Sequence, residues 1–137
     1  MTYERLKKQV LVDIISPGSA IDCAELEAIK KFLKEAGFLC DFIGENQLLL
    51  DKKENHEFSS FLAKDRFFQL ESAICNDSSD IIWCAKGGYG SIELVQFLQK
   101  LKKPKKEKLF IGFSDITILN KLLIEKLGWK VVIAPML

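Results

Sequence analysis

The chain is 137 residues long, with 48% hydrophobic and 28% charged residues and a formal net charge of +1. This length and composition fit a single globular domain with its own core, and the near-neutral charge argues against a general polyanion binder. No apolar run approaches the roughly 20 residues that cross a bilayer, and the charged amino terminus lacks the pattern of a signal peptide. We therefore expect one domain, residues 1–137, with no nucleic-acid or membrane partner.

The four cysteines, Cys23, Cys40, Cys75 and Cys84, include no Cys-x-x-Cys pair. This usage is typical of reduced, mostly buried thiols in a cytoplasmic protein. The only histidine, His56, lies in a polar stretch away from all four cysteines. We therefore expect neither a metal site nor a cofactor.

In the first half of the chain, the apolar pattern alternates between strands and helices. A buried strand is expected at residues 9–15, and the Pro-Gly turn at 16–19 ends it. A helix follows, with Gly37 as its end. Its apolar face consists of Leu26, Ile29, Leu33 and Ala36. A second strand is expected at 38–43, a short extra strand at 48–50 and a solvated loop at 52–56.

The second half continues the alternation. A helix is expected at residues 60–75, with Phe67, Leu70 and Ile74 buried, and a third strand at 81–85. The next helix carries Leu94, Val95, Leu98 and Leu101. The lysine-rich run 100–108 is interpreted as a solvated connection, because no aromatic residue is interleaved in it as in a nucleic-acid site. A strand at 109–111, a helix with Ile116, Leu119, Leu123 and Leu127 on one face, and a strand at 130–134 follow.

Strands that alternate with helices predict βαβ units, and hence an α/β fold with a mainly parallel sheet flanked by helices. Sites in such sheets lie beyond the carboxyl ends of the strands. The candidate site segments are therefore residues 16–19, 86–90 and 112–115.

Ser114 lies where the strand at 109–111 gives way to the last helix, and two interpretations stay open for it. Its hydroxyl and the following amides fit a nucleophile elbow with donors for an oxyanion. Alternatively, Ser114 and Asp115 form an ordinary helix N-cap. The elbow pattern of hydrolases also has Gly two places after the serine, where this chain has Ile116.

The glycine-rich segment 87–90 follows a strand and precedes a helix, so its free amides could hold an oxyanion or a phosphate, or simply form a turn. It lacks both the Gly-x-Gly-x-x-Gly and the Gly-Lys-Ser/Thr patterns, which makes nucleotide binding a weak hypothesis. A serine nucleophile also needs a base, and the only histidine, His56, reads as an exposed loop residue.

Four segments resemble the LD-carboxypeptidases of the serine peptidase type, a family that includes the microcin-immunity peptidases. Residues 15–19 are similar to the family's first strand and Pro-Ser turn, and residues 61–66 to the start of its second helix. Residues 83–90 are similar to its strand ending in Arg-Gly-Gly-Tyr-Gly. Residues 104–120 resemble its Pro-Lys-x-x-Ile-Gly-Tyr-Ser-Asp-Ile-Thr-Ala-Leu segment. The last two motifs, in this order and at this separation, are specific enough to favour Ser114 as a nucleophile.

The resemblance implies a Rossmann-like or flavodoxin-like fold with a nucleophile elbow after a central strand. The implied reaction is removal of the terminal D-alanine from a murein tetrapeptide, in cytoplasmic peptidoglycan recycling, by a Ser-Glu-His triad without a metal. Ser114 would be the nucleophile. The amides of Asp115 and of Gly87 or Gly88 would hold the oxyanion.

The expected substrate-binding residues are Lys86, Tyr89 and Gly90. Lys86 stands where the family usually has Arg, which keeps a charge but loses the guanidinium fork. Residues 133–136 read Ile-Ala-Pro-Met where His-Gly-Pro-Met is common.

The Glu and His of the family's triad come from a second, carboxyl-terminal domain. We expect that domain to be absent here, so that residues 1–137 resemble the amino-terminal half and are inactive alone. A homodimer is a further expectation. The alternatives are a related serine peptidase or amidase that acts on a peptide–nucleotide conjugate, and a non-catalytic α/β binding module.

Overall fold

The computed structural model describes residues 9–44, 62–101 and 103–135. The strands are β1 (Leu11–Ile15), β2 (Leu39–Phe42), β3 (Ile81–Cys84), β4 (Leu109–Ile111) and β5 (Val131–Val132). The helices are α1 (Cys23–Glu35), α3 (Ala63–Cys75), α4 (Val95–Leu98) and α5 (Thr117–Leu127), with the 3-10 turns η3 (Ser91–Leu94) and η4 (Ser114–Ile116). The expected extra strand at 48–50 and the loop with His56 lie outside the described residues.

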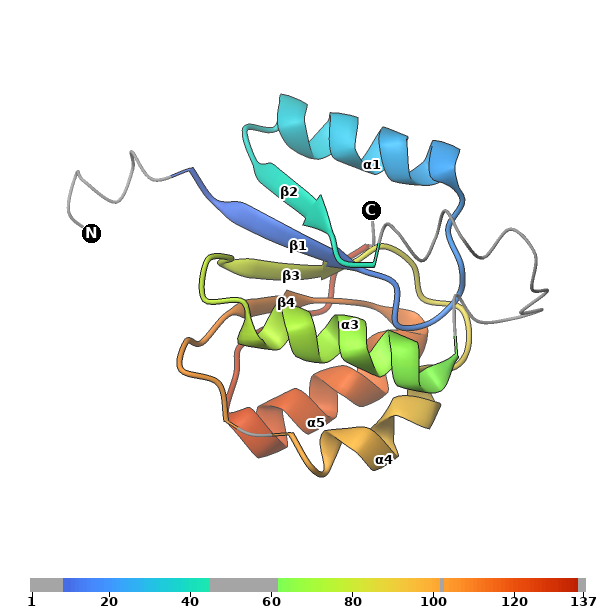
Figure 1. Ribbon diagram of the computed structural model, residues 1–137, viewed down its shortest axis with the longest axis vertical. Coiled ribbons are helices and arrows are strands. Elements are labelled where there is room, and N and C mark those ends of the chain that lie inside the picture. Colours follow the sequence, from blue (N-terminus) through green and yellow to red (C-terminus); the bar gives the residue numbers. More distant parts are fainter. Residues whose placement is uncertain (1–8, 45–61, 102, 136–137) are drawn as a thin grey trace.

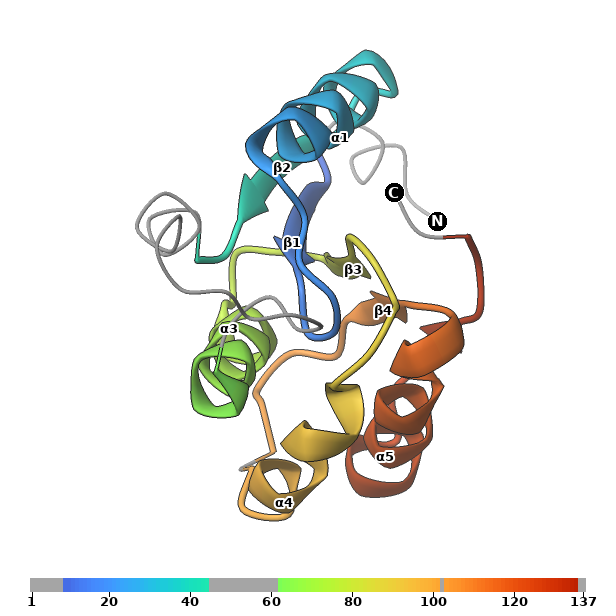
Figure 2. The ribbon, with the colours of Figure 1, turned by 90° about the vertical axis from the view of Figure 1, so that its right-hand side faces the viewer.

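The strands form one parallel sheet in the order β2-β1-β3-β4-β5 (Figure 1). Helix α1 covers one face, and α3, α4 and α5 lie on the other (Figure 2). The predicted α/β fold with a parallel sheet is therefore confirmed, and the strand order is that of flavodoxin-like folds. In this order the connection after β1 and the connection after β3 run in opposite directions, and the carboxyl ends of β1, β3 and β4 lie at one edge of the sheet.

Helix α1 ends just before Gly37, as the sequence predicts, and a capping box that the sequence analysis did not anticipate sets its start. The Asp22 carboxylate accepts a hydrogen bond from the Glu25 amide at 2.7 Å, and the Glu25 carboxylate accepts one from the Asp22 amide at 2.9 Å. This reciprocal capping box satisfies two amides that the first turn leaves without partners. Leu26, Ile29 and Leu33 are buried, whereas Ala36 lies just beyond the helix and is exposed.

Two apolar clusters fill the layers. The larger one lies between the sheet and α3, α4 and α5, and it includes Leu70, Phe110, Ile116 and Leu123. The smaller one lies under α1. The helix expected around Leu94 is split into η3 and α4 and ends at Leu98, although Leu101 beyond it still packs on the larger cluster. The apolar pattern thus predicts the buried face better than the helix boundary.

The lysine-rich run ends in a buried residue, which corrects the interpretation of 100–108 as wholly solvated. Lys108 is 2% exposed, and its ammonium donates to the carbonyls of Ala73 and Asn76 at the end of α3 and to the Ser79 hydroxyl. Its Nζ lies 4.0 Å from the buried Asp13 carboxylate. Burial raises the pKa of Asp13 and lowers the pKa of Lys108. A cation at the carboxyl end of a helix is favourable, so this cluster joins α3 to the amino edge of the sheet.

All four cysteines are free thiols, but only Cys84 is buried. Cys23 and Cys75 are exposed because they occupy the first and last positions of α1 and α3. The expectation of mostly buried thiols is therefore wrong. Burial raises the pKa of Cys84, so its thiol is unreactive near neutral pH. No helix within the described ranges is long and apolar enough to cross a membrane.

Candidate active site

Ser114 is the only residue other than glycine with a positive φ in the described part of the chain, at +59°. It comes three residues after the end of β4 and opens the turn η4, which leads into α5. Its side chain is exposed, and no residue that the structure describes hydrogen bonds to its hydroxyl. A left-handed serine costs free energy that a plain connection would avoid. The backbone therefore has the strained strand-to-helix form of a nucleophile elbow.

The alternative interpretation of Ser114 as a helix cap is wrong. The capping positions of η4 and α5 are occupied by Phe113 and Ile116, and neither makes a side-chain capping bond. The Asp115 carboxylate is engaged elsewhere, as described below. The Ser-Asp pair is therefore not explained by helix capping.

The elbow pattern of hydrolases has a glycine two places after the serine. This chain has Ile116 there and has its glycine, Gly112, two places before the serine instead. A Cβ on Gly112 would lie 2.4 Å from Cγ2 of Ile116, which is fully buried. The Asn120 amide group donates to the Gly112 carbonyl at 3.1 Å, which ties the end of β4 to α5. The tight turn thus accommodates a large side chain after the serine because the residue before it has none.

The segment 87–90 is fixed against the first loop, residues 16–19. The Ser19 amide donates to the Gly87 carbonyl at 2.8 Å, and the Tyr89 amide donates to the Ser19 hydroxyl at 3.1 Å. Gly88 has φ +84°, and a Cβ there would lie 1.8 Å from the Ser19 hydroxyl oxygen. Only glycine fits this conformation and this space.

Asp115 connects this segment to the serine. Its carboxylate accepts a hydrogen bond from the Ser91 amide at 2.9 Å, and its carbonyl accepts one from the buried Ser91 hydroxyl. A Cβ on Gly18 would lie 2.3 Å from the Gly87 carbonyl oxygen and 3.0 Å from the Asp115 carboxylate. The three predicted strand-end segments, 16–19, 86–90 and 112–115, therefore meet at one place.

Backbone donors remain free at this meeting point. The amides of Gly87, Gly88 and Asp115 donate no hydrogen bond to any residue in the described ranges. Unpaired amides on the segments that meet around Ser114 are the kind of donor that stabilisation of an oxyanion requires.

Arg66 is the largest fully buried side chain in the described part, and sequence reasoning gave it no role. Its guanidinium donates to the Pro17 carbonyl at 2.7 Å and to the Gly90 carbonyl at 2.8 Å, and it pairs with the Glu93 carboxylate. It thus joins the first loop, residues 16–19, to the glycine-rich segment 87–90. The signal in the sequence was an arginine at the helical spacing of the apolar positions Leu70 and Ala73.

The three expected substrate-binding residues differ in their surroundings. Lys86 pairs with Glu25 of α1 at 3.1 Å, and Tyr89 has 68% of its surface exposed. The Gly90 carbonyl accepts a hydrogen bond from Arg66, so this group of Gly90 helps to hold the loop in place. His56 lies outside the described residues, and no group of three or more potential metal ligands occurs among the residues that are described.

The family model of the LD-carboxypeptidase N-terminal domain matches residues 12–134. The chain belongs to the LD-carboxypeptidase family. It is 34% identical over 128 residues to the Rickettsia conorii protein named "Putative carboxypeptidase RC0549", a match that covers 91% of this chain and 38% of the relative.

Solved structures of LD-carboxypeptidase relatives have the same fold. A muramoyltetrapeptide carboxypeptidase from Oxalobacter formigenes is 26% identical, with a TM-score of 0.73 over 93% of this chain and 40% of that one. An MccF-like protein from Streptococcus pneumoniae in complex with AMP is 28% identical, with a TM-score of 0.65 over 90% of this chain and 36% of that one. The chain therefore spans about two fifths of the length of these relatives.

Proposed function

We propose that this chain is the nucleophile-bearing domain of a serine LD-carboxypeptidase that removes the terminal D-alanine from a murein tetrapeptide. The observation that carries the proposal is the backbone of Ser114, left-handed at φ +59° with an exposed hydroxyl at the end of β4. Family membership and the muramoyltetrapeptide carboxypeptidase of O. formigenes support the choice of substrate.

In the proposed reaction, a base takes the proton of the Ser114 hydroxyl, and its oxygen attacks the carbonyl carbon before D-alanine. The amides of Asp115 and of Gly87 or Gly88 hold the resulting oxyanion. Collapse of the tetrahedral intermediate expels the amine of D-alanine, which takes the proton back from the base. Water then releases the acyl group from Ser114.

The base in this proposal comes from a second polypeptide segment, the part of the longer relatives that has no counterpart in this chain. This assignment is motivated by the described surroundings of Ser114, where no side chain hydrogen bonds to the hydroxyl. A free serine hydroxyl is a poor nucleophile near neutral pH, so we expect the chain to be nearly inactive alone. The proposed setting is cytoplasmic peptidoglycan recycling.

A second candidate function is hydrolysis of a peptide–nucleotide conjugate by the same Ser114 machinery. It is favoured by the S. pneumoniae relative, whose structure contains AMP. In this case Lys86 and Tyr89, at the edge of the site, are the proposed contacts of the substrate's polar groups.

The test combines covalent labelling with product release. The chain is treated with a serine-directed phosphonate, with and without the carboxyl-terminal part of the R. conorii relative, and the modified residue is identified by mass spectrometry. Murein tetrapeptide and a peptidyl nucleotide are then compared as substrates, with Ser114→Ala as the inactive variant. The matched control is Ser78→Ala, an exposed serine at the opposite edge of the sheet.

We expect labelling at Ser114, D-alanine release only when the second part is present, and no release by the Ser114→Ala variant. Preferred cleavage of the nucleotide conjugate would select the second candidate. Absence of both labelling and release in the complete mixture would indicate a non-catalytic module. Release by the chain alone at an ordinary enzyme rate would show that it contains its own base.

A further inference from the structure

The proposed oxyanion site draws its donors from two segments of the chain. Gly87 and Gly88 follow β3, whereas Asp115 lies in η4 after β4. Donors that stabilise an oxyanion must each lie about 2.7–3.1 Å from the same oxygen, and they must hold that position before the substrate arrives. The contacts that fix these two segments relative to each other therefore decide how well the site works.

Ser91 holds Asp115 through two hydrogen bonds. Its amide donates to the Asp115 carboxylate at 2.9 Å, and its hydroxyl donates to the Asp115 main-chain carbonyl. Ser91 is fully buried, so water does not compete for these bonds. Only two rotatable backbone bonds separate the amide of a residue from its carbonyl. Fixing both the carbonyl and the side chain of Asp115 therefore also restricts the direction of its amide.

The position of Ser91 is itself fixed by its neighbours in the chain. The Gly90 carbonyl, just before it, accepts a hydrogen bond from the buried Arg66. Two residues after it, Glu93 pairs with the same guanidinium, and Leu94 is fully buried in the larger apolar cluster. Ser91 is therefore a firm support for Asp115 at the end of the glycine-rich segment.

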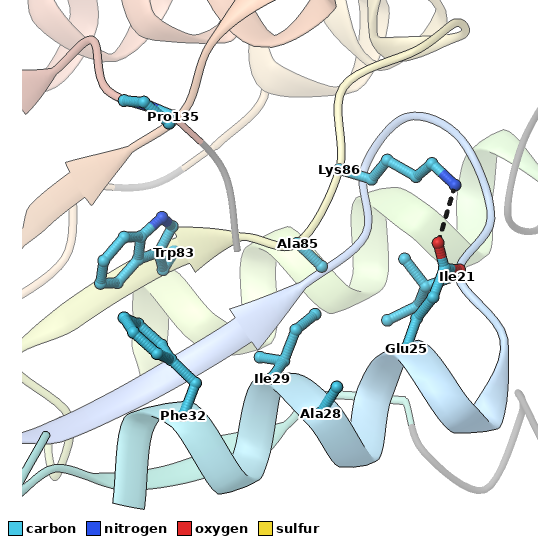
Figure 3. Close-up of a pocket in the computed structure, with 9 residues that line it drawn as sticks. All are labelled: Ile21, Glu25, Ala28, Ile29, Phe32, Trp83, Ala85, Lys86 and Pro135. Carbon is cyan, nitrogen blue, oxygen red and sulfur yellow. Dashed lines mark hydrogen bonds and ion pairs between the residues drawn. The ribbon is translucent and has the colours of Figure 1, made fainter. Parts of the chain in front are cut away.

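The start of the glycine-rich segment has a weaker side-chain anchor. The Lys86 ammonium pairs with the Glu25 carboxylate of α1 at 3.1 Å (Figure 3). The two side chains are 47% and 45% exposed, and ion pairs between exposed groups contribute little. This pair also joins the segment to α1 and not to η4. The buried contacts of Ser91 are therefore the firmer link between the two sets of oxyanion donors.

We propose that Ser91 is a positioning residue of the oxyanion site, which holds the Asp115 amide in place relative to the amides of Gly87 and Gly88. The inference rests on the proposed function, since it assumes that these amides hold the oxyanion. Ser91 acts through Asp115 and does not touch the substrate, because its hydroxyl is buried and donates to the Asp115 carbonyl.

The experiment compares Ser91→Ala with Ser79→Ala in the mixture of the chain with the carboxyl-terminal part of the R. conorii relative. Ser79 is an equally buried serine at the amino edge of the sheet, and its hydroxyl donates to Asp13 and accepts from Lys108. Its loss should destabilise the fold at least as much without changing the carboxyl edge. Circular dichroism establishes that both variants are folded at the assay temperature, and titration with the serine-directed phosphonate counts the active sites.

We expect Ser91→Ala to lower kcat for D-alanine release from murein tetrapeptide by about 10- to 100-fold per active site, with KM nearly unchanged. Oxyanion donors act on the transition state more than on the bound substrate, which gives this division between kcat and KM. The rate of phosphonate labelling at Ser114 should fall as well. Ser79→Ala should leave these rates at the parent values, although it loses stability.

A second readout needs no catalysis. In the chain alone, we expect Ser91→Ala to lower the ¹⁵N order parameter of the Asp115 amide from about 0.85, the value of rigid backbone, towards about 0.6. Ser79→Ala should leave it unchanged. If Ser91→Ala does not fold, Asp115→Ala replaces it, because that side chain is only half-buried and its loss removes the bond from the Ser91 amide. With the other bond retained, kcat should fall by about fivefold.

A kcat for the Ser91 or Asp115 variant within about twofold of the parent overturns the proposal, as does an equal loss in Ser79→Ala. An unchanged order parameter of the Asp115 amide in Ser91→Ala also overturns it. A parent mixture that neither labels at Ser114 nor releases D-alanine refutes the proposed function, and the role of Ser91 with it. The two failures are distinguishable, because only the second one affects the parent.

Discussion

Replacement of Arg66 by alanine is expected to destabilise the fold by removing a single group on which two loops depend. The guanidinium is fully buried and donates to the carbonyls of Pro17 and Gly90. Hydrogen bonds to a charged partner contribute about 1.5–3 kcal/mol each, so two are worth roughly 3–6 kcal/mol. The pair with Glu93 adds little, because that carboxylate is 54% exposed.

Water that enters the vacated space would recover part of this free energy, so we expect a loss of about 3–4 kcal/mol in the free energy of unfolding. The measurement is urea unfolding followed by tryptophan fluorescence. Lys64→Ala, an exposed change on the same helix, is the control and should stay within about 0.5 kcal/mol of the parent.

Arg66→Lys separates charge from geometry. Nη1 donates to both carbonyls while Nη2 pairs with Glu93, and the compact ammonium of lysine cannot reproduce the planar guanidinium that holds all three acceptors. We expect it to recover less than half of the loss. An Arg66→Ala variant within about 1 kcal/mol of the parent would refute the reasoning, since two unpaired buried carbonyls should cost more than that.

Three further substitutions test other parts of the structure. Ser114→Gly should abolish phosphonate labelling yet raise the free energy of unfolding by about 0.5–1 kcal/mol, because glycine accepts the left-handed backbone; equal stability of the parent and this variant would contradict the strain. Gly18→Ala should cost about 1–3 kcal/mol in urea unfolding, because its Cβ would meet the Gly87 carbonyl at 2.3 Å, and a neutral result would contradict the close approach. Lys108→Met should cost about 3–5 kcal/mol near neutral pH by leaving Asp13 unpaired. Burial raises the folded-state pKa of Asp13 above 3.8. The stability that the neutral carboxyl provides is therefore fully present below pH 3.8, and it is lost as the pH rises through the folded-state pKa. The ammonium opposes that rise, so the cost of Lys108→Met should be smaller at about pH 4 than at neutral pH; a cost that does not depend on pH would show that the two groups do not interact.

The strands and helices that form the layers of this fold can be predicted from the sequence because each is determined by a pattern of neighbouring residues. Apolar runs of strand length, helical faces such as Leu26 to Leu33, and a glycine after α1 all act over a few residues. The same holds for Ser114, where a strand, a glycine and a helical face follow one another within ten residues.

What the sequence does not predict depends on distant partners. Arg66 reads as one more charged residue on a helix, since nothing nearby indicates that its acceptors are Pro17 and Gly90. Lys108 reads as part of a solvated run because its acceptors lie at the end of α3 and in the turn after it, and its counter-charge belongs to β1. Tertiary packing sets the surroundings of both residues, and the spacing of apolar residues along the chain does not report which distant polar groups a buried charge will meet.

The position of β1 inside the sheet has a consequence for how the chain acquires its structure. β1 pairs with β2 on one side and with β3 on the other, and the Leu11 amide reaches the Asp80 carboxylate, 69 residues further along. During synthesis from the amino terminus, β1 and β2 can pair early, but the second edge of β1 stays open until β3 has been made. Closing such long loops is entropically costly and slows folding. We therefore expect the step that joins β3 to β1 to limit the folding rate, and chains truncated before residue 81 to aggregate through the open edge of β1.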